Sequence, residues 1–67
     1  MQVIPFNQLP ENIQAIFRSE RANCTCYVKD GLKEGTERYY VRFCGEMSVF
    51  AYKNGTWEHL KSYGVSY

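Results

Sequence analysis

Residues 37–57 read ERYYVRFCGEMSVFAYKNGTW, and this stretch decides the fold. Aromatic and β-branched residues fill it, and glycine interrupts it at Gly45 and Gly55, at the spacing of short hairpins. This pattern is typical of an antiparallel meander. We therefore expect strands at residues 38–44 and 47–52, joined through Cys44-Gly45-Glu46, and a further strand at about 56–62.

Period-two alternation assigns the side chains of the two central strands to opposite faces of a sheet. One set has the composition of a core face: Tyr39, Val41, Phe43, Met47, Val49 and Ala51. The other set is Arg38, Tyr40, Arg42, Ser48, Phe50 and Tyr52. This second set is too aromatic for an ordinary solvent-exposed face, so it carries the functional signal of the sequence.

The segment before this stretch predicts a helix followed by one more strand. Pro10 suits the first turn of a helix, and Ile13, Ile16 and Phe17 follow at the spacing of one helical face. We expect an amphipathic helix of about three turns. Residues 23–30 alternate again and predict a strand, followed by a charged, glycine-flanked loop at 30–36. In the lead-in before the helix, Pro5 is expected to prevent regular strand pairing.

The register of the last hairpin has two solutions. A two-residue Asn54-Gly55 turn pairs Tyr52 with Trp57 and places the indole on the outer face. A three-residue loop that begins at Lys53 pairs Ala51 with Trp57 instead. We prefer the second solution, because it sets the smallest inward residue opposite the largest and buries the indole.

Length and composition exclude several classes of protein. A chain of 67 residues has room for one domain, at 1–67. Its hydrophobic fraction of 45% and aromatic fraction of 16% favour a compact sheet protein over disorder. The net charge of +1 gives no general attraction to nucleic acid or anionic membranes. No apolar run approaches the roughly 20 residues of a membrane span, and the start has no pattern of a secretory leader.

The three cysteines are expected to be structural. Cys24 and Cys26 share one face of a strand, where a bond between them would strain the backbone. A zinc site normally needs a fourth ligand and Cys-x-x-Cys-type spacing, whereas His59 is the only histidine and no second cysteine pair exists. We therefore predict two buried thiols, with Cys44 near a turn, and no metal or cofactor site. Three unpaired thiols favour a reducing compartment such as the cytoplasm.

No motif of an enzyme is present in the sequence. Phosphate-loop, nucleophile-elbow and zinc-protease signatures are all missing. His59 could act as a base for a cysteine nucleophile, but a lone histidine on a terminal strand is more often a half-exposed sheet residue. We expect no catalytic activity.

The outer face is the candidate partner-binding site, and its predicted members are Tyr27, Tyr40, Arg42, Phe50 and Tyr52. Aromatic side chains around an arginine are enriched at protein-binding hot spots. Alternatively, cross-strand aromatic pairs only stabilise the sheet, or the tail covers them. A third interpretation is nucleic-acid stacking on aromatics beside Arg38 and Arg42. The near-neutral charge and the missing βαββαβ order argue against the third.

Three short motifs resemble those of the PepSY-like family, whose small domains are common in gut Bacteroidetes and share the β-lactamase-inhibitor-protein fold. The motifs are Leu9-Pro10 at the helix start, Tyr39-x-Val41-x-Phe43, and Asn54-Gly55-x-Trp57, within a similarity over residues 3–60. Where the family usually has Phe-Asp, this chain has Ala51-Tyr52. The resemblance implies a non-enzymatic binding or inhibitory module. Family members are typically exported to the periplasm and often carry two units, whereas this sequence shows one unit and no leader, so its localisation stays open.

Together these patterns predict an α+β, two-layer domain in which an N-terminal helix packs on a four-stranded antiparallel meander. The predicted core comprises Ile13, Ile16, Phe17, Cys26, Val28, Val41, Phe43, Val49 and Trp57. The predicted function is protein binding through the outer face, by self-association as a dimer or with another protein. The alternative function is nucleic-acid binding through tyrosine, phenylalanine and arginine stacking.

Overall fold

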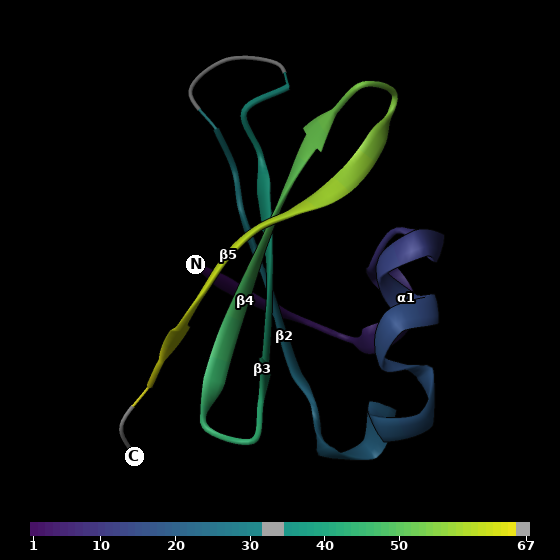
Figure 1. The fold of residues 1–67 in the computed structure, drawn as a ribbon, viewed down its shortest axis with the longest axis vertical. Coiled ribbons are helices and arrows are strands. Elements are labelled where there is room, and N and C mark those ends of the chain that lie inside the picture. The colour runs from purple at the N-terminus through teal and green to yellow at the C-terminus, as the bar shows by residue number, and fades with distance from the viewer. Residues whose placement is uncertain (32–34, 66–67) are drawn as a thin grey trace.

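The computed structural model describes residues 1–31 and 35–65, and in them one α-helix lies beside a five-stranded antiparallel sheet (Figure 1). The strands pair in chain order and are β1 (Gln2–Ile4), β2 (Thr25–Lys29), β3 (Arg38–Phe43), β4 (Glu46–Lys53) and β5 (Thr56–Gly64). The α+β class is confirmed, with five strands in place of the expected four. Positions 32–34 of the predicted loop and 66–67 of the tail lie outside the described residues.

The additional strand is β1, which pairs with β2 through Gln2–Val28, Val3–Tyr27 and Ile4–Cys26. It ends directly before Pro5. The prediction that Pro5 prevents regular pairing was wrong, because a proline disturbs a strand at its own position and the three residues before it remain free to pair. β1 therefore forms one edge of the sheet and contributes Ile4 to the core.

The α-helix α1 (Glu11–Phe17) is shorter than expected and continues into the 3₁₀ segment η2 (Arg18–Asn23). A 3₁₀ turn, η1 (Phe6–Gln8), precedes it. Leu9 and Ile13 are buried and Phe17 is half-buried, so the core stripe follows a four-residue spacing. Ile16 lies beside that stripe and is 58% exposed, which corrects its place in the predicted core. In the described part of the chain, no helix has the length and apolar character needed to cross a membrane.

The turn between β3 and β4 reverses the faces predicted for β4. It has two residues, Cys44 and Gly45, with φ of 52° and 76°, and it pairs Phe43 with Glu46. The predicted three-residue connection would have placed Met47 on the side of Phe43. A shift of one position moves every side chain to the other face, so Phe50 lies on the helix side.

The hairpin between β4 and β5 also has a two-residue turn, Asn54-Gly55, so the preferred pairing of Ala51 with Trp57 was wrong. Tyr52 stands opposite Trp57 instead. Because the faces of β4 are reversed as well, Trp57 still reaches the helix side, and its ring centroid lies 4.8 Å from that of Tyr39. Asn12 of α1 donates a hydrogen bond from Nδ2 to the carbonyl oxygen of Trp57, which links the helix to β5.

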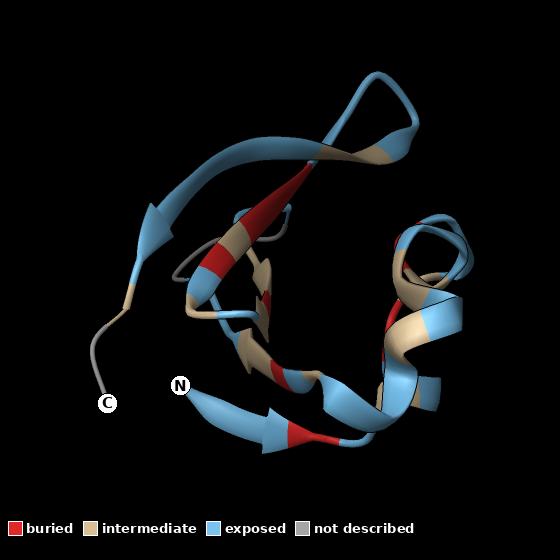
Figure 2. Cartoon of the chain, turned by 60° about the horizontal axis from the view of Figure 1, so that its bottom comes forward, coloured by how far each residue is buried: buried red, intermediate tan, exposed pale blue. Residues whose placement is uncertain are grey.

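The main core lies between α1 and the sheet and consists of Ile4, Leu9, Ile13, Cys26, Val41 and Phe50. Phe17 meets Phe50 edge to face, with ring centroids 6.1 Å apart. Of the other predicted core residues, Phe17, Val28 and Trp57 pack against this cluster and Phe43 is half-buried. Figure 2 shows that buried positions concentrate along β4, which has buried side chains on both of its faces.

Candidate functional site

We call the face of the sheet opposite α1 the outer face. The strand registers assign its side chains, because residues directly opposite each other in a ladder share a face. Its members are Val3, Thr25, Tyr27, Lys29, Arg38, Tyr40, Arg42, Met47, Val49, Ala51, Lys53, Thr56, Glu58, Lys61 and Tyr63.

The structure brings together three of the five predicted site residues. Tyr27 and Tyr40 stand directly opposite each other, and Arg42 follows on the same face of β3. All three are half-buried. Phe50 is 1% exposed in the main core, and Tyr52 is 49% exposed beside Trp57 on the helix side. The reversed β4 register therefore removes both residues from the outer face.

A row of buried apolar side chains on β4 stands between the tyrosines of the outer face. Met47, Val49 and Ala51 point to the outer face, yet they are only 5%, 2% and 1% exposed. Tyr40 is opposite Val49, and Tyr63 of β5 is opposite Met47. The sequence interpretation missed Tyr63, because the β4–β5 ladder shifts register beside Phe50 and plain alternation fails along β5. Tyrosines of the two neighbouring strands thus flank the buried row of β4.

The outer face is also strongly basic. It carries five cationic residues, Lys29, Arg38, Arg42, Lys53 and Lys61, and one acidic residue, Glu58. Lys29 is directly opposite Arg38. The guanidinium of Arg38 donates to the carbonyl oxygens of Thr36 and Glu37, at 3.1 and 2.9 Å. The net charge of +1 conceals this separation, and only the registers show it.

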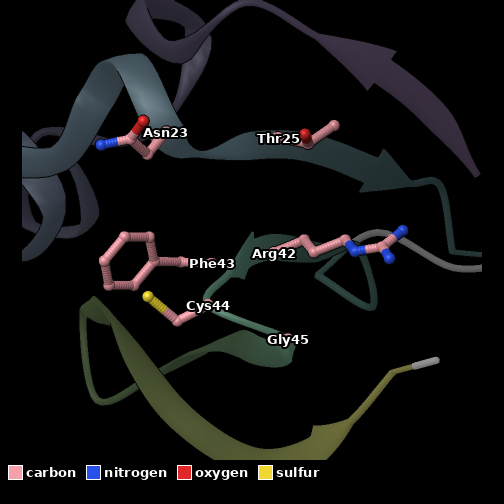
Figure 3. Close-up of a pocket in the computed structure, with 6 residues that line it drawn as sticks. All are labelled: Asn23, Thr25, Arg42, Phe43, Cys44 and Gly45. Carbon is pink, nitrogen blue, oxygen red and sulfur yellow. The ribbon is translucent and has the colours of Figure 1, made fainter. Parts of the chain in front are cut away.

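A pocket of about 270 Å³ opens at the end of β3, where the outer face meets the Cys44-Gly45 turn (Figure 3). It is lined by Asn23, Thr25, Arg42, Phe43, Cys44 and Gly45. The side chains of Arg42 and Phe43 extend in opposite directions, as successive residues of a strand do. The Thr25 hydroxyl and the Arg42 side chain make the lining partly polar, and the Asn23 amide donates to the carboxylate of Glu20 at 3.2 Å.

All three cysteines are free thiols: Cys44 is exposed, Cys24 is half-buried and Cys26 is buried. Burial raises the pKa of the Cys24 and Cys26 thiols above 9.0, and for Cys24 the nearby Glu20 and Cys44 raise it further. Such thiols stay protonated near neutral pH and are weak nucleophiles. The Cys24 thiol donates to the carbonyl oxygen of Glu20 at 3.3 Å. Within residues 1–31 and 35–65, no three His, Cys, Asp or Glu side chains are placed to hold a metal ion.

One histidine–serine contact lies on the helix side of β5. His59 Nε2 and Ser62 Oγ are 2.7 Å apart, and Ser62 Oγ lies 3.3 Å from Ser48 Oγ. A hydrolase would add an acid that orients the imidazole and a set of donors for an oxyanion. Among the described residues, no carboxylate is hydrogen-bonded to His59. The contact is best explained as a side-chain network that holds the bulged part of β5.

No family model, no curated protein and no solved structure matches this chain. The resemblance to PepSY-like domains, carried by Leu9-Pro10 and by the motifs ending at Phe43 and Trp57, therefore remains a hypothesis.

Proposed function

We propose that this chain is a small protein-binding module without enzymatic activity and that it acts through the outer face. The observation that carries the proposal is that Tyr27, Tyr40, Arg42 and Tyr63 share one face of the sheet, the face that α1 does not cover. Tyrosine and arginine are enriched among residues that dominate binding energy. A binding role is also what the resemblance to PepSY-like domains implies.

The outer face favours a different protein over a second copy of this chain. A symmetric dimer through this face would bring its five cations against an identical set, with one acid per copy to offset them. Like charges placed together across an interface cost several kcal/mol. Light scattering over a range of concentrations is expected to give the mass of a monomer. A concentration-dependent dimer that Tyr40→Glu abolishes would restore the self-association alternative.

The binding role is tested with variants on the two sides of the sheet. The chain is immobilised and exposed to an extract of the cells that produce it, and retained proteins are identified. Tyr27→Ala/Tyr40→Ala is expected to lose a specifically retained protein. Tyr52→Ala is the matched control, since Tyr52 is an exposed tyrosine on the helix side. Equal retention by wild type and both variants would refute a role for the outer face.

Single-stranded nucleic acid is a second candidate ligand, favoured by the cations that surround Tyr27 and Tyr40. Sheet-borne aromatics flanked by basic residues stack bases in several RNA-binding domains. The net charge of +1 and the half-buried tyrosine rings weigh against it. Fluorescence anisotropy with a labelled oligothymidylate tests this candidate, because genuine binding would weaken steeply as salt is added.

A further inference from the structure

We propose that the partner of the outer face is an acidic, extended segment of another protein, whose carboxylates lie among Lys29, Arg38 and Lys61. This inference rests on the proposed function and adds the chemistry of the partner. The outer face has the charge to attract such a segment and hydroxyl donors to hold it, as three features of the sheet show.

The first feature is the separation of charge across the sheet. Among the described residues, the only lysine or arginine residues away from the outer face are Arg18 and Arg21, in η2. The acidic residues lie mostly elsewhere: Glu11 and Glu20 are in the helical segment, and Glu46 is opposite Phe43 on the helix side. Asp30 and Glu37 lie just beyond the ends of β2 and β3. The outer face is therefore positive although the chain is nearly neutral.

The second feature is the direct pairing of Lys29 with Arg38. Like charges opposite each other in a sheet destabilise it. The two hydrogen bonds from Arg38 to backbone carbonyl oxygens keep its guanidinium beside this end of the ladder. A bound carboxylate would neutralise the repulsion. The Lys29–Arg38 pair therefore lowers the stability of the isolated chain. An acidic partner that neutralises the two charges would remove this cost.

The third feature is the spacing of donors around Tyr40. Lys29 lies two positions from Tyr27 along β2, which corresponds to about 7 Å. Lys61 is opposite Val49, which is itself opposite Tyr40, so it lies two strands away at about 10 Å. Phenolic hydroxyls donate well to carboxylates. An extended peptide repeats its side chains on one face at the same spacing of about 7 Å, so acidic residues two positions apart match Lys29 and Tyr27 along β2.

An acidic peptide fits these observations better than nucleic acid. Base stacking needs several open aromatic faces, whereas Tyr27 and Tyr40 are half-buried and Tyr63, at 42% exposed, is the one open tyrosine among the described residues of the outer face.

The test measures the anisotropy of a short fluorescein-labelled peptide of alternating glutamate and threonine, at low salt. The same peptide with glutamine in place of glutamate is expected to bind at least about tenfold more weakly. Lys29→Gln/Lys61→Gln is expected to weaken binding of the glutamate peptide about tenfold. The matched control, Arg18→Gln/Arg21→Gln, removes the same charge from η2 and is expected to bind like wild type.

Three outcomes would overturn the proposal: no binding of the glutamate peptide, equal weakening by both double variants, or tighter binding of an oligothymidylate. Lys29 and Lys61 are exposed, so both variants should fold, and circular dichroism checks this. If either double variant misfolds, single substitutions at the same positions are compared. Loss of peptide binding with continued tyrosine-dependent capture would reject the acidic partner and leave the proposed function standing.

Discussion

Tyr39 stands directly opposite Phe50 in the β3–β4 ladder, with both rings on the helix side of the sheet. This pairing follows from the two-residue turn at Cys44-Gly45. It places Phe50 in the main core, where its ring centroid lies 6.1 Å from that of Phe17 and 5.5 Å from that of the exposed His59. The role of Phe50 is therefore structural.

Phe50→Ala is expected to unfold the chain, because removing a buried phenylalanine costs about 3–5 kcal/mol, as much as a domain of this size holds. Tyr52 lies two residues further along β4 on the same face and is 49% exposed, so Tyr52→Ala should lower the free energy of unfolding by only about 1 kcal/mol. Urea unfolding followed by circular dichroism measures both. A folded Phe50→Ala variant would contradict the register.

Lys29→Glu is expected to raise the stability of the isolated chain by about 0.2–1 kcal/mol, because it converts a like-charge pair with Arg38 into an opposite-charge pair. The same change should abolish binding of an acidic peptide. Lys53→Glu is the control, because Lys53 is opposite Thr56 and gains no such pair. Unfolding midpoints in urea give the comparison. If Lys29→Glu raised stability but left peptide binding unchanged, Lys29 would not belong to the peptide-binding site.

Cys44→Asn is expected to stabilise the chain by up to about 1 kcal/mol, because Cys44 has a φ of 52° and asparagine tolerates the left-handed region better. Gly55→Ala should have the opposite sign and cost about 1 kcal/mol, since Gly55 has a φ of 82°. Thermal unfolding of both variants tests the turn geometry. Stabilities that do not change would mean that neither turn has the described conformation.

The three thiols are expected to react with iodoacetamide in the order Cys44, Cys24, Cys26. Cys44 is exposed, Cys24 is half-buried and Cys26 is buried. Mass spectrometry over time gives the three rates, and denaturant serves as the control because it should make them similar. Cys26 reacting first in the native chain would contradict its place in the core.

Stability is expected to fall as the pH rises above 9.0, the ordinary pKa of the thiols of Cys24 and Cys26. Both pKa values are raised in the folded chain, so the folded state keeps protons that the unfolded chain releases. This contribution is fully present below 9.0 and is lost in the alkaline range above it. Melting temperatures measured across that range should decline less for Cys24→Ala/Cys26→Ala.

The sequence predicted the elements of this fold better than their registers. Hydrophobic spacing located the helix after Pro10 and four of the five strands, because burial of one face imposes a period on each element. The β3–β4 turn was misjudged because Cys44, unlike asparagine or glycine, gives no signal for a left-handed residue. At Asn54-Gly55 the turn signal was clear, but a preference for pairing Trp57 with a small residue outweighed it.

The same misjudged turn explains why only part of the candidate site was predicted correctly. Tyr27, Tyr40 and Arg42 lie on β2 and β3, where simple alternation holds. Phe50 and Tyr52 lie beyond the misjudged turn, so they were assigned to the wrong face. The basic character of the outer face depends on registers across four strands, and no local pattern in the sequence reports it.

The hydrogen bond from Asn12 to the carbonyl oxygen of Trp57 also has a consequence for solubility. β5 is a nine-residue edge strand, and the backbone groups of such an edge can template strand addition by another chain. The helix occupies one of these groups at the start of the edge. Transient undocking of α1 would uncover it together with the apolar core, so aggregation should begin at β5 and should track the stability of the helix rather than that of the sheet.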